Sequence, residues 1–131
     1  MGISLDGVLE ADATANRTVL ILDADPGLRT FLAPFLSRSR FRLVQVQSER
    51  QMLTVLRSTR PRVIVLDFAL VGTSRMDLIG LLRRNDEWRR IPLLVMSDET
   101  AGAFPTRVDA PVIYKLDRGG LVARLEAALA R

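Results

Sequence analysis

Five short apolar runs, each followed by a stretch with helical character, constrain the fold of this chain more than any other feature. They are TVLILD at 18–23, FRLVQV at 41–46, VIVLD at 63–67, IPLLVMS at 91–97 and PVIYKL at 111–116. The third run is apolar up to its final aspartate, which is typical of a strand covered on both faces. Strands that alternate with helices predict a parallel sheet with helices on both sides.

Helix signals fill the segments between these runs. Asp25 followed by Pro26 predicts an N-cap with proline at the first helical position, and Asp117 is expected to cap the last helix. Pro34 lies inside the first helix, where we expect a kink or an early weakening. A glycine and a proline close together predict only a short or irregular helix over 98–110.

Two further helices are predicted from capping-box patterns, in which a serine or threonine is followed three residues later by an acid or amide. Ser48 with Gln51 opens one helix, and Ser74 with Asp77 opens the next. Five strand–helix units fit an α/β, flavodoxin-like, doubly wound sheet of strand order 2-1-3-4-5.

The chain is expected to form one domain over 17–131. Residues 1–16 are small, polar and weakly patterned, so we expect a flexible N-terminal extension there. No apolar run approaches the ~20 residues that a membrane span needs, and the N-terminus does not look like a secretory signal. A cytoplasmic location is the default expectation.

The composition excludes several kinds of chemistry. The chain has no cysteine and no histidine. Thiol catalysis, disulfides, zinc fingers and histidine general bases are therefore ruled out.

Basic residues outnumber acidic ones, with 18 arginines and one lysine against 15 acids, for a net charge of +4. Three arginine clusters stand out. They are Arg38, Arg40 and Arg42; Arg57, Arg60 and Arg62; and Arg83, Arg84, Arg89 and Arg90. Such a balance can indicate a polyanionic partner, with Trp88 stacking on a base, but it is more often an arginine-biased solvated surface with the tryptophan packed at a helix end.

Polar side chains follow four of the predicted strands. Asp23, Asp67 and Ser97 end three of them, and Lys115 lies near the end of the fifth. In doubly wound sheets the working site lies beyond the carboxyl ends of the strands, so these groups are expected to converge. Each alone fits a turn or cap residue. Lys115 is distinctive because every other basic residue is arginine, and a compact ammonium suits contact with a single oxygen.

At these positions the chain resembles the response-regulator receiver family of two-component signalling. LILDADPGLR resembles the family's first-strand acidic motif, and VIVLDF resembles its phosphoacceptor strand. LLVMSD resembles the strand that ends in threonine or serine, and VIYKL the strand that ends in lysine. The resemblance covers about residues 17–131, with the four blocks in the family's order.

The resemblance implies a role for each of these residues. Asp67 would accept a phosphoryl group from a histidine kinase. Asp23, Asp67 and the main-chain carbonyl of Ala69 would hold Mg²⁺. Ser97 would bind a phosphoryl oxygen, and Lys115 would pair with Asp67 or its phosphate. A divalent cation is needed because crowded acids repel one another and the incoming phosphoryl group.

The chain also departs from the family pattern. Ala24 replaces the second acid of the first-strand pair, and Asp25 is expected to be a helix cap rather than a substitute. Leu116 stands where proline usually follows the lysine, and Val112 where an aromatic residue is common. The loop after Asp67 looks longer than usual. We therefore expect an atypical, non-enzymatic receiver with weak or absent Mg²⁺ binding and phosphorylation, whose output depends on protein contacts.

The expected partners are a histidine kinase or a downstream signalling protein, with a homodimer as a further option. No membrane partner is expected. The alternative function is an arginine-rich nucleic-acid-binding protein, although no helix-turn-helix or RNA-binding motif is present. A flavodoxin-like cofactor binder ranks last, because the loop DADPG begins with acids that would repel phosphate.

Overall fold

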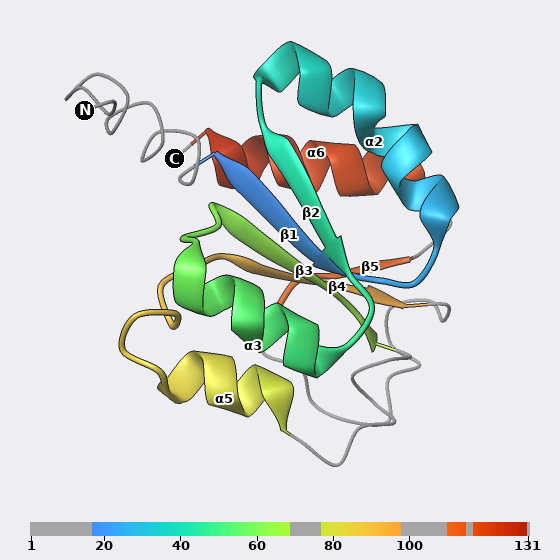
Figure 1. The fold of residues 1–131 in the computed structure, drawn as a ribbon. Coiled ribbons are helices and arrows are strands. Elements are labelled where there is room, and N and C mark those ends of the chain that lie inside the picture. Colours follow the sequence, from blue (N-terminus) through green and yellow to red (C-terminus); the bar gives the residue numbers. More distant parts are fainter. Residues whose placement is uncertain (1–16, 69–76, 98–109, 115–116, 131) are drawn as a thin grey trace, which may run out of the picture.

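The computed structural model describes residues 17–68, 77–97, 110–114 and 117–130. This part of the chain contains five strands and four helices. In chain order they are β1 (Thr18–Leu22), α2 (Pro26–Ser39), β2 (Arg42–Val46), α3 (Glu49–Ser58), β3 (Val63–Asp67), α5 (Leu78–Arg84), β4 (Leu93–Ser97), β5 (Val112–Tyr114) and α6 (Arg118–Leu129). All strand pairs are parallel, in the order β2-β1-β3-β4-β5, so the predicted doubly wound topology is confirmed (Figure 1).

Side chains at alternate strand positions pack into two separate cores, one on each face of the sheet. Helices α2 and α6 cover the first face, and α3 and α5 cover the second (Figure 1). The first core takes from the strands Val19, Ile21, Val63, Val65, Leu94, Met96 and Ile113. The second takes Leu20, Leu22, Val46, Ile64, Leu66 and Leu93. A strand with an apolar residue at every position is thus explained by burial on both sides.

The strand register brings the carboxyl ends of the strands to one edge of the sheet. Leu22 of β1 pairs with Leu66 of β3, and each is followed by an aspartate. Asp67 pairs in turn with Met96 of β4, and Ser97 follows at the next position. The ends of β1, β3 and β4 therefore present polar groups at nearly the same level.

Side-chain caps begin the helices largely as predicted. The carboxylates of Asp25 and Asp117 accept hydrogen bonds from the main-chain N–H groups of Gly27 and Gly120. The Ser48 hydroxyl accepts from the N–H of Gln51, as in a capping box. The predicted cap of α2, that of α3 and that of α6 are all confirmed.

The capping box predicted for α5 is wrong. Asp77 is itself the N-cap, because its carboxylate accepts a hydrogen bond from the N–H of Gly80, and the helix begins at Leu78. The sequence does not distinguish an acid at the third helical position from an acid at the N-cap. Here the Asp77 carboxylate caps a helix that begins later than predicted. Ser74 lies outside the described residues, as does nearly all of the segment 98–110 for which an irregular helix was predicted.

Pro34 does not end the helix in which it lies. Helix α2 continues to Ser39, where its C-cap residue Arg40 has a left-handed backbone with φ of 61°. Leu32 and Phe35, on either side of the proline, are both buried in the first core. Tertiary packing therefore holds the helix together across a residue that disfavours helix interiors.

None of the helices in the described ranges is both long and apolar enough to cross a membrane.

Candidate functional site

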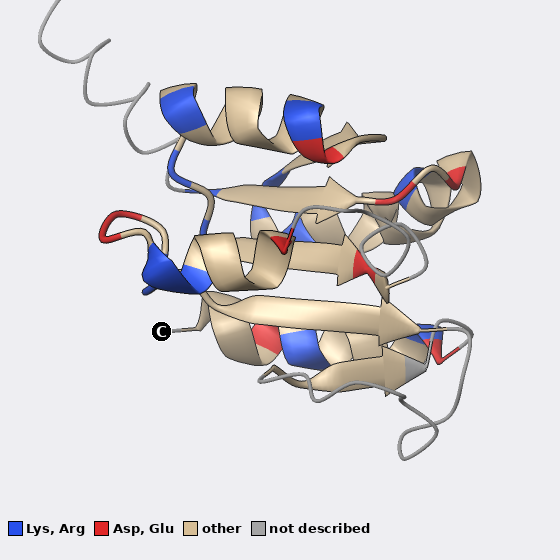
Figure 2. Ribbon diagram, turned by 90° about the horizontal axis from the view of Figure 1, so that it is seen from below, with Lys and Arg blue, Asp and Glu red and all other residues tan. Residues whose placement is uncertain are grey.

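Two buried aspartates on neighbouring strands form the centre of the candidate site. Asp23 directly follows β1 and is 1% exposed, and Asp67 ends β3 and is 5% exposed. Neighbouring strands lie about 4.8 Å apart, so the two residues leave the sheet side by side. Acidic residues gather beyond the strand arrowheads in Figure 2. Because burial of carboxylates is costly unless other groups compensate, such a pair is typical of a functional site.

The loop between β1 and α2 is held by hydrogen bonds that use the acids on both sides of position 24. The Asp23 carboxylate accepts from the N–H of Asp25 at 2.8 Å, and the Asp25 carboxylate accepts from the N–H of Gly27 at 2.9 Å. Asp25 is thus committed to capping α2. Ala24, between the two acids, is exposed and offers only a methyl group.

Gln45 of β2 also binds this loop, and sequence reasoning did not single it out. Its side-chain amide donates to the main-chain carbonyls of Asp23 and Asp25, at 2.8 and 2.7 Å. The only sequence signal is an amide in the middle of the apolar run FRLVQV. Its partners lie 22 and 20 residues earlier in the chain, so no local pattern could reveal the contact.

Ser97 lies at the same edge of the sheet. It ends β4, is 5% exposed and pairs with Tyr114 of β5. Of the five predicted site residues, the structure therefore brings Asp23, Asp67 and Ser97 to one edge. Lys115 and Ala69 lie outside the described residues. The roles assigned to all five stay predictions.

Asp23 and Asp67 are the two buried acids at this edge of the sheet that could take part in a Mg²⁺ site. Among the residues that the structure describes, no group of three or more aspartates, glutamates, histidines or cysteines could hold a metal ion. Mg²⁺ requires near-octahedral oxygen coordination, and one oxygen of Asp23 already accepts a main-chain hydrogen bond. Position 24, between Asp23 and Asp25, is alanine and adds no side-chain ligand atom.

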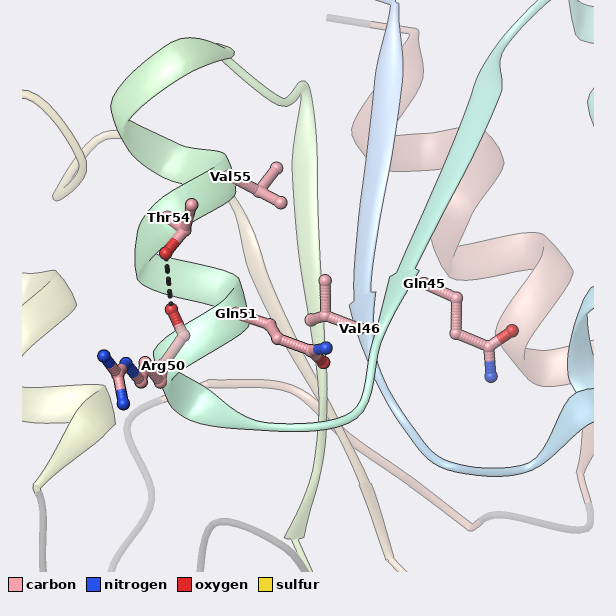
Figure 3. Close-up of a pocket in the computed structure, with 6 residues that line it drawn as sticks. All are labelled: Gln45, Val46, Arg50, Gln51, Thr54 and Val55. Atoms are coloured by element: carbon pink, nitrogen blue, oxygen red, sulfur yellow. Dashed lines mark hydrogen bonds between the residues drawn. The ribbon is translucent and has the colours of Figure 1, made fainter.

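A pocket of about 360 Å³ lies beside the edge strand β2. It is lined by Gln45, Val46, Arg50, Gln51, Thr54 and Val55. Figure 3 shows that the Gln45 side chain points away from α3, whereas the last four residues belong to that helix. The lining has no carboxylate, so this pocket does not extend the acidic site.

Arginines mark the opposite, amino-terminal edge of the sheet. Arg17 precedes β1, Arg42 begins β2, and Arg62 precedes β3. Arg17 has a structural role there, since its guanidinium donates hydrogen bonds to the carbonyls of Ser39 and Arg40. Its Cζ atom also lies 4.3 Å from the centre of the Phe41 ring. Parts of two predicted arginine clusters thus share one edge, away from the acids.

Trp88 packs as a structural residue. It is partly buried against the second core, the one shared by α3 and α5. The structure therefore favours the helix-end packing interpretation over base stacking.

Several known proteins with similar sequences are response regulators. The phosphate regulon transcriptional regulatory protein PhoB of Pseudomonas aeruginosa is 27% identical over 121 residues, which cover 88% of this chain and 53% of that protein. The two-component response regulator ORR3 of Oryza sativa subsp. indica is 30% identical over 91 residues, covering 69% of this chain and 67% of that protein. No protein-family model matches the chain. The chain spans about half the length of PhoB and of similar bacterial regulators.

Solved structures show the same fold. The chemotaxis response regulator CheY4 of Vibrio cholerae superposes with a TM-score of 0.71 at 18% identity, covering 86% of this chain and 98% of that one. The receiver domain of a sensor histidine kinase from Pseudomonas aeruginosa, solved with a magnesium ion coordinated in its active-site cleft, gives a TM-score of 0.66 at 18% identity over 88% and 99% of the two chains. The fold is that of a receiver domain. With the sequence relatives, it places this chain in the response-regulator receiver family of two-component signalling.

Proposed function

We propose that this receiver carries Asp67 as its phosphoacceptor position but is phosphorylated weakly or not at all in a Mg²⁺-dependent reaction, and that it signals mainly through protein contacts. The proposal is based on the side chains of the β1–α2 loop that follow Asp23. Ala24 is exposed and has no ligand atom in its side chain, while Asp25 is occupied as the cap of α2. In our proposal Asp25 therefore serves as a cap and does not replace the acid that is missing at position 24.

Charge explains why this loop matters. A phosphoryl donor is an anion and would approach Asp67 against the combined field of two buried carboxylates, Asp67 and Asp23. A bound cation removes that repulsion in sites of this chemistry. In our proposal Lys115 supplies part of the compensation, Ser97 binds a phosphoryl oxygen, and the carbonyl of Ala69 is a weak metal ligand. A receiver domain of similar fold is described with a magnesium ion in its own active-site cleft, which supports the possibility of Mg²⁺ binding here.

The remaining assignments complete the proposal. Residues 17–131 form the receiver and residues 1–16 an extension. The module acts in the cytoplasm without enzymatic activity of its own, and its partners are a histidine kinase or a downstream signalling protein, with a homodimer as an option.

Phosphorylation of the unaltered chain tests this proposal. We expect slow or no addition of a phosphoryl group when the protein is incubated with a small phosphodonor and Mg²⁺, as followed by intact-mass spectrometry. Asp67→Asn is the control, because it keeps the shape of the side chain and removes the nucleophile. Rapid, Mg²⁺-dependent addition of one phosphoryl group, lost in Asp67→Asn, would show that the site is not impaired.

The arginine-rich edge leads to a separate prediction about nucleic acid. At least one of its arginines, Arg17, is used in packing, and Trp88 is partly buried in a core. We therefore expect only weak, electrostatic binding to random duplex DNA, and the affinity should fall steeply and vanish as salt rises to about 0.15 M. Fluorescence anisotropy at low and physiological salt measures this. Tight, sequence-specific binding at the higher salt would instead favour the nucleic-acid alternative.

A further inference from the structure

One side chain of the edge strand β2 joins both sides of position 24. The amide nitrogen of Gln45 donates to the carbonyl of Asp23 at 2.8 Å and to the carbonyl of Asp25 at 2.7 Å. These two carbonyls bracket Ala24. Figure 3 shows the Gln45 side chain turned away from α3, and these bonds take it to the β1–α2 loop.

We call the two hydrogen bonds from Gln45 to the β1–α2 loop a clamp. A main-chain hydrogen bond from the same strand adds to it. The N–H of Asp23 donates to the carbonyl of Val46 at 3.0 Å. Residues 45 and 46 therefore make three hydrogen bonds to the loop that carries the first acid of the site. Within the loop, the bonds from Asp25 to Asp23 and from Gly27 to Asp25 continue the chain of contacts into helix α2.

The chemistry of this clamp requires an amide. A glutamine has two N–H groups on one nitrogen, and here each meets a carbonyl oxygen. Glutamate has no donor when ionised, and methionine has a similar length but no N–H. Because Gln45 is only half-buried, hydrophobic packing alone does not account for its place in the strand.

We propose that Gln45 is a positioning residue of the acidic site. It fixes the backbone on both sides of position 24, so that Asp23 stays beside Asp67 and Asp25 stays in its capping role. This inference rests on the proposed function, in which the acids at this edge form the cation and phosphoacceptor site. Gln45 is not proposed to touch a cation or a phosphoryl group.

The experiment uses a background in which the site can bind a cation measurably. We place Gln45→Met in the full chain carrying Ala24→Asp and titrate Mg²⁺ by calorimetry. Gln51→Met is the matched control, since the Gln51 side-chain oxygen accepts a hydrogen bond from the N–H of Gln47, just before α3, and makes no bond to the β1–α2 loop. Both variants lose a glutamine that lines the same pocket.

We expect Gln45→Met to weaken Mg²⁺ binding about tenfold and Gln51→Met to change it less than about twofold, because only the first releases two hydrogen bonds of the acidic loop. Amide hydrogen exchange gives a second readout in the unaltered background. The N–H groups of Asp25 and Gly27 should exchange faster in Gln45→Met, whereas those of the strand β3 should not.

The outcomes separate this inference from the function on which it rests. If Ala24→Asp itself gains no affinity for Mg²⁺, the proposed function fails. If Ala24→Asp gains affinity and Gln45→Met leaves it unchanged, or if Gln51→Met lowers it equally, the positioning role is overturned. Should Gln45→Met not fold, Gln45→Asn decides the matter in the same titration, because it keeps the amide but is one methylene too short to bridge both carbonyls.

Discussion

Replacing Ala24 with aspartate is expected to raise the affinity of the chain for Mg²⁺ at least about tenfold, which corresponds to about 1.4 kcal/mol. The substitution adds a charged oxygen ligand at an exposed position next to Asp23 and at the same sheet edge as Asp67. Mg²⁺ usually takes only one or two protein carboxylates, so one added acid is a large fraction of its protein ligands. Calorimetric titration of the two proteins measures the difference.

Two controls separate charge from other effects of this substitution. Ala24→Asn supplies a neutral oxygen and should gain less affinity than Ala24→Asp. Asp25→Asn keeps a good N-cap for α2 and removes the negative charge from the residue that follows Ala24. Because the Asp25 carboxylate bonds to the N–H of Gly27, Asp25→Asn should leave Mg²⁺ affinity nearly unchanged. A large loss in Asp25→Asn would mean that Asp25 serves as the missing ligand.

Truncation of Leu20 to alanine is expected to lower the free energy of unfolding by about 2–5 kcal/mol. Leu20 is 0% exposed, lies in β1 between β2 and β3, and packs into the second core. Domains of this kind are stable by only about 5–15 kcal/mol, so such a loss is a large part of the total.

Leu53→Ala is the matched control for this core substitution. Leu53 is only partly buried and packs against the same core from α3. The decrease in the free energy of unfolding should be clearly smaller for Leu53→Ala than for Leu20→Ala. Urea denaturation followed by circular dichroism measures both. Equal losses in the two variants would show that Leu20 is not more important to the core than the partly buried Leu53.

Much of the fold could be predicted because buried parallel strands leave a strong mark on the sequence. A run such as VIVLD at 63–67 is apolar up to its final aspartate, which predicts a strand covered on both sides. Five strand-like runs with helical segments between them then leave few topologies. The cap at Asp25 was equally clear, because proline follows it. The start of α5 was misjudged because an acid can be either a cap or the partner of a cap, and only the fold chooses between them.

The candidate site was only partly predictable for a different physical reason. Acids at the ends of β1 and β3 could be expected to meet once a parallel sheet was predicted. Gln45 could not, because its role comes from hydrogen bonds to residues 20 and 22 positions away rather than from its neighbours in sequence. A second example is the group of Arg17, Arg42 and Arg62. These residues are far apart in sequence, and only the fold brings them to the amino-terminal edge of the sheet.

Titration of the unaltered chain with Mg²⁺ distinguishes a weakened cation site from an intact one. We expect no saturable binding below about 1 mM Mg²⁺, equivalent to less than about 4 kcal/mol of binding free energy, alongside a measurable gain in Ala24→Asp. Saturation at one Mg²⁺ per chain well below that concentration, abolished by Asp67→Asn, would contradict this expectation and show that the site binds its cation without a second acid at position 24.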